Sequence, residues 1–368
     1  MKEASLSSAV PAKAPAKPRR LFIEGDELYA AMLDAIRGAR HSIKLESYIF
    51  ADDEIGRQFA AALGERARAG VQVLVNIDAA GSLFWASRRL EKALKRDGVE
   101  VHWFHRWSWR DPWRYNRRNH RKLLVVDGRV GFLGGFNIHR ENSRKVYGET
   151  RWRDTHVEVR GQLARNLQAL FDAFWRGQRR RYPVTRSADG NLITNHSHRG
   201  RLLLRNLYAA RFAISRQRIW LTTPYFVPDR RTQRSLMAAA RRDVDVRVLV
   251  PHKSDVRIAQ WAARAAYAAL LAAGVRIYKY RPRMLHAKTV TIDGAWCSVG
   301  TANIDYRSFF LNYELTLTSR DSGFVAVLET QFLTDLEQSE QIFPARWAQR
   351  GWLTRVLEFI GWLGRRWL

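Results

Sequence analysis

The chain carries one short pattern twice, and this duplication limits its possible folds more than any other feature of the sequence. Each copy reads His-x-Lys, then four residues, then Asp, and an Asn follows ten residues after that Asp. The motif residues are His120, Lys122, Asp127 and Asn137 in the first copy, and His286, Lys288, Asp293 and Asn303 in the second. Agreement at so many spaced positions predicts two homologous halves within one chain.

Each motif is expected to lie on a strand that turns into a second strand. Leu-Leu-Val-Val follows Lys122 and Thr-Val-Thr-Ile follows Lys288, and both runs end in Asp-Gly, a strong hairpin signal. Side chains alternate across a strand, so the His and Lys of one motif share a face. An imidazole beside a fixed ammonium suits attack on a phosphodiester. No cluster of Cys, Asp or Glu indicates a metal, and no cofactor is expected.

The duplicated motif, with Gly-Gly or Gly-Thr shortly before each Asn, resembles the phospholipase D superfamily. That resemblance implies an α/β fold of two homologous α/β/α sandwich halves, related by a pseudo-twofold axis around one composite active site. One His attacks phosphorus and forms a phosphohistidine, and the other acts first as acid and then as base. The usual family order makes His120 the nucleophile and His286 the acid/base, although the symmetry permits the reverse.

The resemblance also implies roles for the surrounding residues. Both motif lysines and both asparagines would hold the phosphoryl oxygens, whereas the motif aspartates would fix the turn. An attacking imidazole needs a carboxylate on its other nitrogen, and two candidates fit. Asp154 lies in Trp-Arg-Asp-Thr-His156, in which the His is expected to be structural. Glu314 closes a family-like string that begins at Asn303 and includes Ser308.

The charge of the chain indicates a polyanionic partner. The formal net charge is +28, well beyond what solubility requires, and favours an anionic membrane or nucleic acid. The segment 105–119 alternates Arg with Trp and Tyr, which fits lipid headgroups or single-stranded nucleic acid equally well, or an exposed loop with Trp packed beneath it. The single Cys297 excludes an internal disulfide framework and is expected to be a small buried hydrophobe.

The order of apolar patterns along the chain predicts its division. Residues 1–20 form a disordered basic arm without a secretory signal, 21–178 the first half, 179–201 a polar linker and 202–340 the second half. Strands alternate with helical patterns in both halves, which indicates α/β architecture. His196 and His198 are expected to be solvated residues of the linker rather than metal ligands. No apolar stretch approaches the roughly 18 residues of a spanning helix.

Residues 341–368 predict an amphipathic helix rich in Trp and Arg. Helical spacing gathers its large apolar residues on one side and places Arg350, Thr354 and Glu358 on the other. The apolar residues are Trp352, Leu353, Val356, Leu357, Phe359, Ile360, Leu363 and Trp367. Two interpretations are open: the helix lies in a bilayer surface, or it docks on the protein's own core.

Further strings resemble bacterial cardiolipin synthases of a short branch without N-terminal membrane spans. They are Glu46-Ser-Tyr-Ile-Phe, Thr-Pro-Tyr-Phe-Val-Pro-Asp229, and the string that ends at Glu314. The resemblance implies transfer of a phosphatidyl group to phosphatidylglycerol with release of glycerol, on the cytoplasmic face of the cell membrane, by a peripheral enzyme that needs no protein partner. A phospholipase D-type hydrolase or nuclease is the alternative, and a non-catalytic membrane or nucleic-acid scaffold a weaker one. Either phosphatidylglycerol or phosphatidylethanolamine fits as donor, and the oligomeric state is open.

Overall fold

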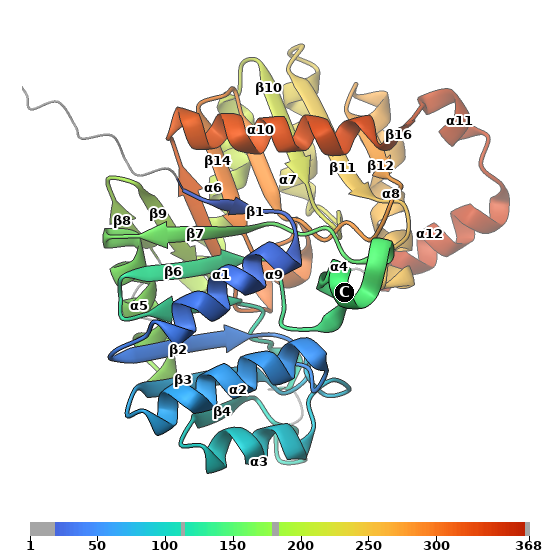
Figure 1. Ribbon diagram of the computed structural model, residues 1–368. Coiled ribbons are helices and arrows are strands. Elements are labelled where there is room, and N and C mark those ends of the chain that lie inside the picture. The colour runs from blue at the N-terminus through green and yellow to red at the C-terminus, as the bar shows by residue number, and fades with distance from the viewer. Residues whose placement is uncertain (1–18, 112–114, 179–183, 365–368) are drawn as a thin grey trace, which may run out of the picture.

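The chain folds around two mixed sheets that repeat the same topology (Figure 1). The computed structural model describes residues 19–111, 115–178 and 184–364. Most of the expected basic arm and Trp367 lie outside these residues.

The first sheet has the strand order β1-β7-β6-β5-β2-β3-β4. Its strands are β1 (Leu21–Phe22), β2 (Ser42–Ser47), β3 (Gln72–Asp78), β4 (Glu100–Phe104), β5 (Leu123–Val126), β6 (Val130–Gly134) and β7 (His156–Arg160). Strands β2, β3 and β4 are parallel. Strand β5, which directly follows His120 and Lys122 of the first motif, pairs antiparallel with β2.

The second sheet has the order β16-β12-β11-β10-β13-β14-β15-β9-β8. Its strands are β8 (Val184–Ser187), β9 (Gly190–Thr194), β10 (Arg218–Thr222), β11 (Asp245–Pro251), β12 (Arg276–Tyr280), β13 (Thr289–Ile292), β14 (Trp296–Gly300), β15 (Leu315–Ser319) and β16 (Ser339–Ile342). Six neighbouring strands, from β15 to β12, repeat the order and the parallel and antiparallel pairings of β7 to β4. The predicted α/β fold with two homologous halves is confirmed.

Helices cover both faces of each sheet. The outer helices are α1 (Gly25–Arg37), α2 (Glu54–Arg68) and α3 (Arg88–Arg96) in the first half, and α6 (His198–Ile214), α7 (Arg230–Ala240) and α8 (Arg257–Ala272) in the second. The helices α5 (Gln162–Trp175) and α10 (Ser322–Glu337) follow the last core strand of each half. The shorter segments are η2 (Arg140–Asn142), α4 (Arg144–Tyr147), η3 (Gly148–Thr150), α9 (Tyr306–Phe310), α11 (Pro344–Ala348) and α12 (Trp352–Gly364).

The sequence explains where these helices begin and which face they bury. Asp53, Ser87 and Asp229 each accept a backbone N–H in the first turn of α2, α3 and α7, which satisfies donors that the helix itself leaves unpaired. In α1 the buried residues Leu28, Met32, Leu33 and Ile36 recur at helical spacing.

A shared core joins the halves. One cluster of buried side chains draws Leu133 and Val157 from the first sheet, Val299 and Leu317 from the second, and further residues from α5 and α10. Cys297 is fully buried in the same cluster, as its sequence context predicted. Two further clusters lie beneath the outer helices, one in each half. Because the shared core spans both sheets, the halves form one body.

Part of the expected linker is folded. Residues 184–194 form the hairpin β8–β9, which extends the second sheet through β15, and α6 begins at His198. His196 is part of this folded region, since its Nε2 lies 2.8 Å from the Arg121 guanidinium. At the other end of the chain Arg19, assigned to the basic arm, donates to Ser319 Oγ at 2.7 Å and stacks over Phe324. His196, expected to be a solvated linker residue, is thus tied to the first half, and Arg19 is tied to the second.

The C-terminal helix α12 docks on α8 through its polar side. Glu358 and Gly361 are its buried residues, and the Gly361 backbone lies against Trp261 and Ala262. Its large apolar side chains face outward, so the helix docks on the protein but does not bury its apolar face in the protein's own core. No helix among the described residues is both long and apolar enough to cross a membrane.

Candidate active site

The two motif aspartates hold the hairpins that carry the histidines. Asp127 has a φ of 52° and its carboxylate accepts the backbone N–H groups of Arg40, His41 and Ser42 at 2.8–2.9 Å. Asp293 repeats this arrangement with residues 216–218 at 2.8–2.9 Å. Both carboxylates therefore lie a strand's length away from the histidines and tie each hairpin to the preceding strand. They were grouped with the catalytic residues of the motif and expected to fix the turn; these hydrogen bonds agree with the turn role, and neither residue lines the cavity described below.

Each histidine is positioned by backbone from the opposite half. The His120 N–H donates to the Tyr313 carbonyl at 3.0 Å, and the His286 N–H donates to the Arg153 carbonyl at 2.7 Å. Tyr313 precedes Glu314 in the chain and Arg153 precedes Asp154. The same backbone hydrogen bond that positions a histidine of one half therefore also brings a carboxylate of the other half beside that histidine.

The imidazoles are oriented by a reciprocal exchange of carboxylates. His120 Nδ1 lies 3.0 and 3.1 Å from the two oxygens of Glu314, and His286 Nδ1 lies 2.5 Å from Asp154 Oδ2. A carboxylate can only accept, so each Nδ1 carries the proton and each Nε2 is left with its lone pair. The sequence had identified both carboxylates, and the structure assigns Glu314 to His120 and Asp154 to His286.

Nearby positive charges, together with hydrogen bonds, keep the carboxylates ionised. Burial alone would raise the pKa of Asp154, but Lys288 and His286 hold it at about 2. Burial likewise acts to raise the pKa of Glu314, yet His120, Lys122 and the Thr301 hydroxyl lower it below its ordinary value. Thr301 Oγ1 donates to Glu314 at 2.5 Å.

Burial makes both histidines weak bases. Desolvation lowers the pKa of His120 to about 4 in spite of Glu314, and it lowers the pKa of His286 in spite of Asp154. Both rings are therefore neutral near pH 7. A neutral imidazole with a fixed Nδ1–H has the form required of a nucleophile or a general base.

The two lysines lie behind the histidines rather than in the wall of the cavity described below. Lys122 Nζ donates to the His120 carbonyl at 2.8 Å, and Lys288 Nζ donates to the His286 carbonyl. Burial lowers the pKa of Lys122 to about 7, with Lys288 adding to the effect, and it also lowers the pKa of Lys288. An anion bound in the site would raise the pKa of both lysines and so restore their charged ammonium forms.

One cavity of about 320 Å³ brings both histidines together with both motif asparagines. Its walls also include Tyr48, Ile49, Trp152, Tyr225, Val227, Asp255, Val256, Ala259, Asp305, Arg307 and Asn312. Asn137 Oδ1 accepts from the Ile49 N–H at 3.1 Å, which leaves its amide N–H₂ for a ligand. Ser308 does not line the cavity; its hydroxyl accepts the Asn303 N–H at 3.1 Å and so shapes the loop that bears Asn303.

Several wall residues were not identified from the sequence. Tyr48 packs edge-on against His120, with ring centroids 4.9 Å apart, and Trp152 lies 5.1 Å from His286. Tyr225 donates to Asp255 at 2.7 and 2.8 Å beside them. Tyr48, Trp152 and Tyr225 all fall within strings that resemble the family, which was the one available signal. The cavity thus has a polar floor and an aromatic rim.

Buried ion pairs hold the chain around the cavity. Arg121, which lies between His120 and Lys122, donates through Nε to Glu46 at 2.6 Å, and both side chains are fully buried. Arg153 of the first half donates to Asp335 of α10 at 2.7 and 3.1 Å. These pairs fix the peptides that carry His120 and Asp154.

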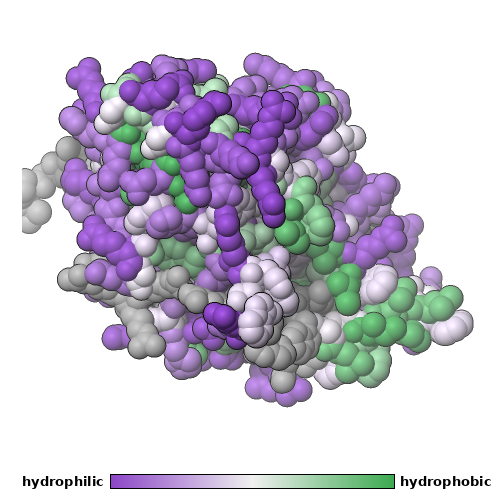
Figure 2. Space-filling view, turned by 90° about the horizontal axis from the view of Figure 1, so that it is seen from below, coloured by the Kyte–Doolittle hydropathy of each residue, from purple (hydrophilic) through white to green (hydrophobic). Residues whose placement is uncertain are grey.

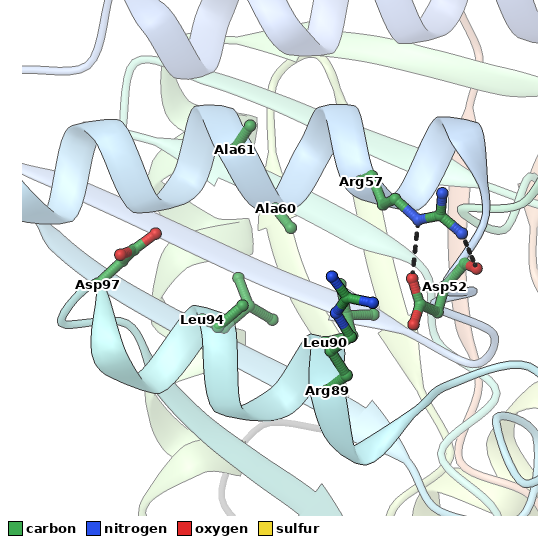
Figure 3. Close-up of a pocket in the computed structure, with 9 residues that line it drawn as sticks. Asp52, Arg57, Ala60, Ala61, Arg89, Leu90, Leu94 and Asp97 are labelled. Atoms are coloured by element: carbon green, nitrogen blue, oxygen red, sulfur yellow. Dashed lines mark hydrogen bonds and ion pairs between the residues drawn. The ribbon is translucent and has the colours of Figure 1, made fainter.

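Two other kinds of site, a metal centre and a second hollow, offer no alternative active site in the described ranges. No group of three or more His, Cys, Asp or Glu residues in those ranges is placed to hold a metal ion. A hollow of about 390 Å³ between α2 and α3 (Figure 3) contains no histidine, and its Arg57 is bonded to Asp52 at 3.0 Å. It lies on the outer helices, away from both motif hairpins.

Two carboxylate-anchored histidines from duplicated halves, meeting at one cavity, define a phosphodiester-processing site of the phospholipase D type. Comparison with known families agrees: the model described as cardiolipin synthase, phospholipase D-like domain, matches residues 32–175 and 208–336. The chain belongs to this family.

Similar proteins include a cardiolipin synthase of Halalkalibacterium halodurans, 36% identical over 355 residues that make up 92% of this chain and 70% of that protein. A cardiolipin synthase A of Pseudomonas fluorescens is 35% identical over 333 residues, 88% of this chain and 69% of that protein. Among solved structures, a phosphatidylserine synthase of Haemophilus influenzae superposes with a TM-score of 0.73 at 13% identity and covers 95% of both chains. That last likeness supports the fold alone.

Proposed function

We propose that the chain is a cardiolipin synthase that passes a phosphatidyl group to phosphatidylglycerol through a phosphohistidine, on the cytoplasmic face of the cell membrane. The observation that carries this proposal is the pair of histidines, each held by the other half's carboxylate, on one cavity. Its lipid specificity rests on the cardiolipin synthases that are 36% and 35% identical over most of the chain.

The first step forms a bond between His120 Nε2 and the phosphorus of the donor lipid. The bond from phosphorus to the headgroup oxygen breaks, and His286 gives its proton to that oxygen, so that an alcohol leaves. The neutral state of His120 in the cavity supplies the nucleophile. The phosphodiester's negative charge raises the pKa of His286, which allows this residue to enter the step protonated.

The second step reverses the first with a new alcohol. A hydroxyl of phosphatidylglycerol attacks phosphorus, His286 takes its proton, and the bond to His120 breaks. With phosphatidylglycerol as donor the products are cardiolipin and glycerol, and the proton count is unchanged. Lys122, Lys288 and the amide of Asn137 oppose the charge on the phosphoryl oxygens.

The walls of the cavity favour a lipid. Tyr48, Ile49, Trp152 and Val256 surround the polar floor with apolar surface, which suits a glycerol backbone and the start of an acyl chain. Apolar walls also exclude water from the phosphohistidine, as transfer in preference to hydrolysis requires.

Lipid product analysis by mass spectrometry tests the proposal. Purified protein is incubated with vesicles of phosphatidylglycerol and phosphatidylethanolamine, beside His120→Ala and the control His198→Ala, whose histidine is exposed at the start of α6. Cardiolipin formed by the parent and the control, but not by His120→Ala, is the expected result. Phosphatidic acid alone would identify a hydrolase, and the absence of lipid turnover together with cleavage of DNA would identify a nuclease.

The order of the histidines has its own test. A phosphatidyl donor with nitrophenol as leaving group needs no acid, so His286→Ala should release one equivalent of nitrophenolate in a burst and then stall without its base. His120→Ala should give no burst. The opposite pattern would make His286 the nucleophile.

A further inference from the structure

The outward face of α12 is built from side chains that a protein helix normally buries. Its exposed large apolar residues are Trp352 (71% exposed), Leu353 (61%), Val356 (45%), Phe359 (59%), Ile360 (45%) and Leu363 (57%). They recur at intervals of three and four residues, so they share one side of the helix. Figure 2 shows the resulting hydrophobic surface on the right of the molecule, where α12 lies.

The opposite side of the helix is fixed to the protein. Glu358 is buried and accepts from Arg350 Nε at 3.0 Å through both oxygens. One turn further on, Gly361 packs so closely on α8 that a Cβ there would lie 2.4 Å from the Ala262 nitrogen. A helix whose polar and small residues face the protein cannot turn its apolar face inward without breaking these contacts.

We propose that this face of α12 is a membrane-docking surface that seats the enzyme on an anionic bilayer. A continuous apolar helix face of this size marks an interaction site on a folded protein. Arg355 is exposed three residues from Trp352 and four from Phe359, where its guanidinium can reach phosphate at the level of the headgroups. The net charge of +28 repels a second copy of the chain and attracts anionic lipid, which favours a bilayer as the occupant.

The position of the surface next to the active site supports this assignment. Val256 and Ala259, at the beginning of α8, line the catalytic cavity, and Ala262, against which Gly361 packs, lies one turn later, about 5 Å along the helix. Trp362 of α12 and Val227 line a neighbouring hollow of about 450 Å³, and Val227 also lines the catalytic cavity. The proposed docking surface and the catalytic cavity are therefore both built against the first two turns of α8.

A fluorescent probe on α12 tests docking without relying on catalysis. Cys297 is the one native cysteine and is fully buried, so an environment-sensitive label on Phe359→Cys reports from the proposed surface. Leu333→Cys on α10, 39% exposed, is the matched control. Vesicles of phosphatidylglycerol and phosphatidylcholine should shift the emission of the α12 label to shorter wavelength and leave the control unchanged. No shift, or equal shifts at both positions, would overturn the proposal, as would a shift that appears on concentrating the protein without lipid.

A second variant separates docking from chemistry, since the lipid substrate rests on the proposed function. Trp352→Ser, Phe359→Ser and Leu363→Ser together should raise the vesicle concentration for half-maximal binding about ten-fold or more, with an equal loss of vesicle turnover. Turnover of dispersed short-chain phosphatidylglycerol should stay within about two-fold of the parent, because the cavity is untouched. Equal loss on both substrates would mean that α12 only supports the fold. A parent enzyme inert towards every lipid would refute the proposed function and leave the probe result standing.

Discussion

At the scale of single residues, the site depends on which carboxylate orients which imidazole. Glu314 is 194 residues from His120 in the sequence, and Asp154 is 132 residues from His286. The duplicated motif identified both histidines and the family resemblance identified both carboxylates, but spacing along the chain contains no information on pairing across the pseudo-twofold axis. That pairing is determined by the backbone N–H of each histidine, which donates to a carbonyl of the opposite half.

We expect replacement of either anchor by its amide to reduce turnover while the cavity keeps its shape. Glu314→Gln and Asp154→Asn remove the acceptor charge that holds Nδ1–H, and kcat should fall about 10²- to 10⁴-fold with little change in KM. If His120 is the nucleophile, Glu314→Gln also suppresses the nitrophenolate burst, whereas Asp154→Asn retains it and loses later turnover. Thr301→Val, which removes one donor to Glu314, serves as the milder control. Equal bursts in both amide variants would contradict the assigned roles.

Anion binding should depend on pH through the buried lysine. The pKa of Lys122 is lowered to about 7 in the free site, and a bound phosphate raises it by direct attraction. Binding then takes up a proton above pH 7, so affinity should be greatest below pH 7 and fall as the pH rises. Titration calorimetry with dimethyl phosphate, a diester anion that does not titrate between pH 6 and 9, in buffers of different ionisation enthalpy, measures the uptake directly. Lys122→Met should abolish most of it, and affinity that stays constant from pH 6 to 9 would contradict the expectation.

At the scale of elements, the fold follows closely from the sequence where apolar periodicity is strong. The strands around both motifs lie where alternation predicted them, whereas α6 begins at His198, inside the stretch expected to be a linker. The β8–β9 hairpin was missed because it directly follows the Arg-rich run 179–181 and is largely polar itself, although Asp189-Gly190 between short alternating runs is a hairpin signal. In α12 the periodicity identified two faces but not which of them meets α8, because that choice depends on the close approach at Gly361.

The hairpin anchor should contribute measurably to stability. Asp127→Ala leaves three backbone N–H groups without their charged acceptor, and we expect a loss of about 2 kcal/mol or more in the free energy of unfolding. Those hydrogen bonds lower the pKa of Asp127, against the effect of burial, so its contribution is present above the unfolded pKa and is lost as the pH falls towards the folded value. Urea unfolding at pH 7 and pH 3 checks both statements; Asp34→Ala, an exposed residue of α1, is the control. A variant as stable as the parent at pH 7 would show that the anchor is dispensable.

At the scale of the whole molecule, the halves are held together by charge as well as by their common core. Arg153 and Asp335 join the first half to α10 in a buried pair. Arg153→Met strands the Asp335 carboxylate, which should cost about 3–5 kcal/mol in the free energy of unfolding. The double variant Arg153→Met/Asp335→Leu should recover most of that loss, since no isolated charge remains. Thermal unfolding of the two variants beside Asp335→Leu provides the comparison, and a double variant no more stable than Arg153→Met would show that the pair acts otherwise.

The reciprocal exchange of carboxylates also has an evolutionary consequence. Because the carboxylate beside each histidine comes from the opposite half, an ancestral single half could have completed a site only as a homodimer, with two identical histidines meeting in one centre on its symmetry axis. Joining the two copies in one gene removed the requirement that they stay identical. The anchors could then become a glutamate beside one histidine and an aspartate beside the other, and two chemically equivalent residues could take up different steps of one reaction.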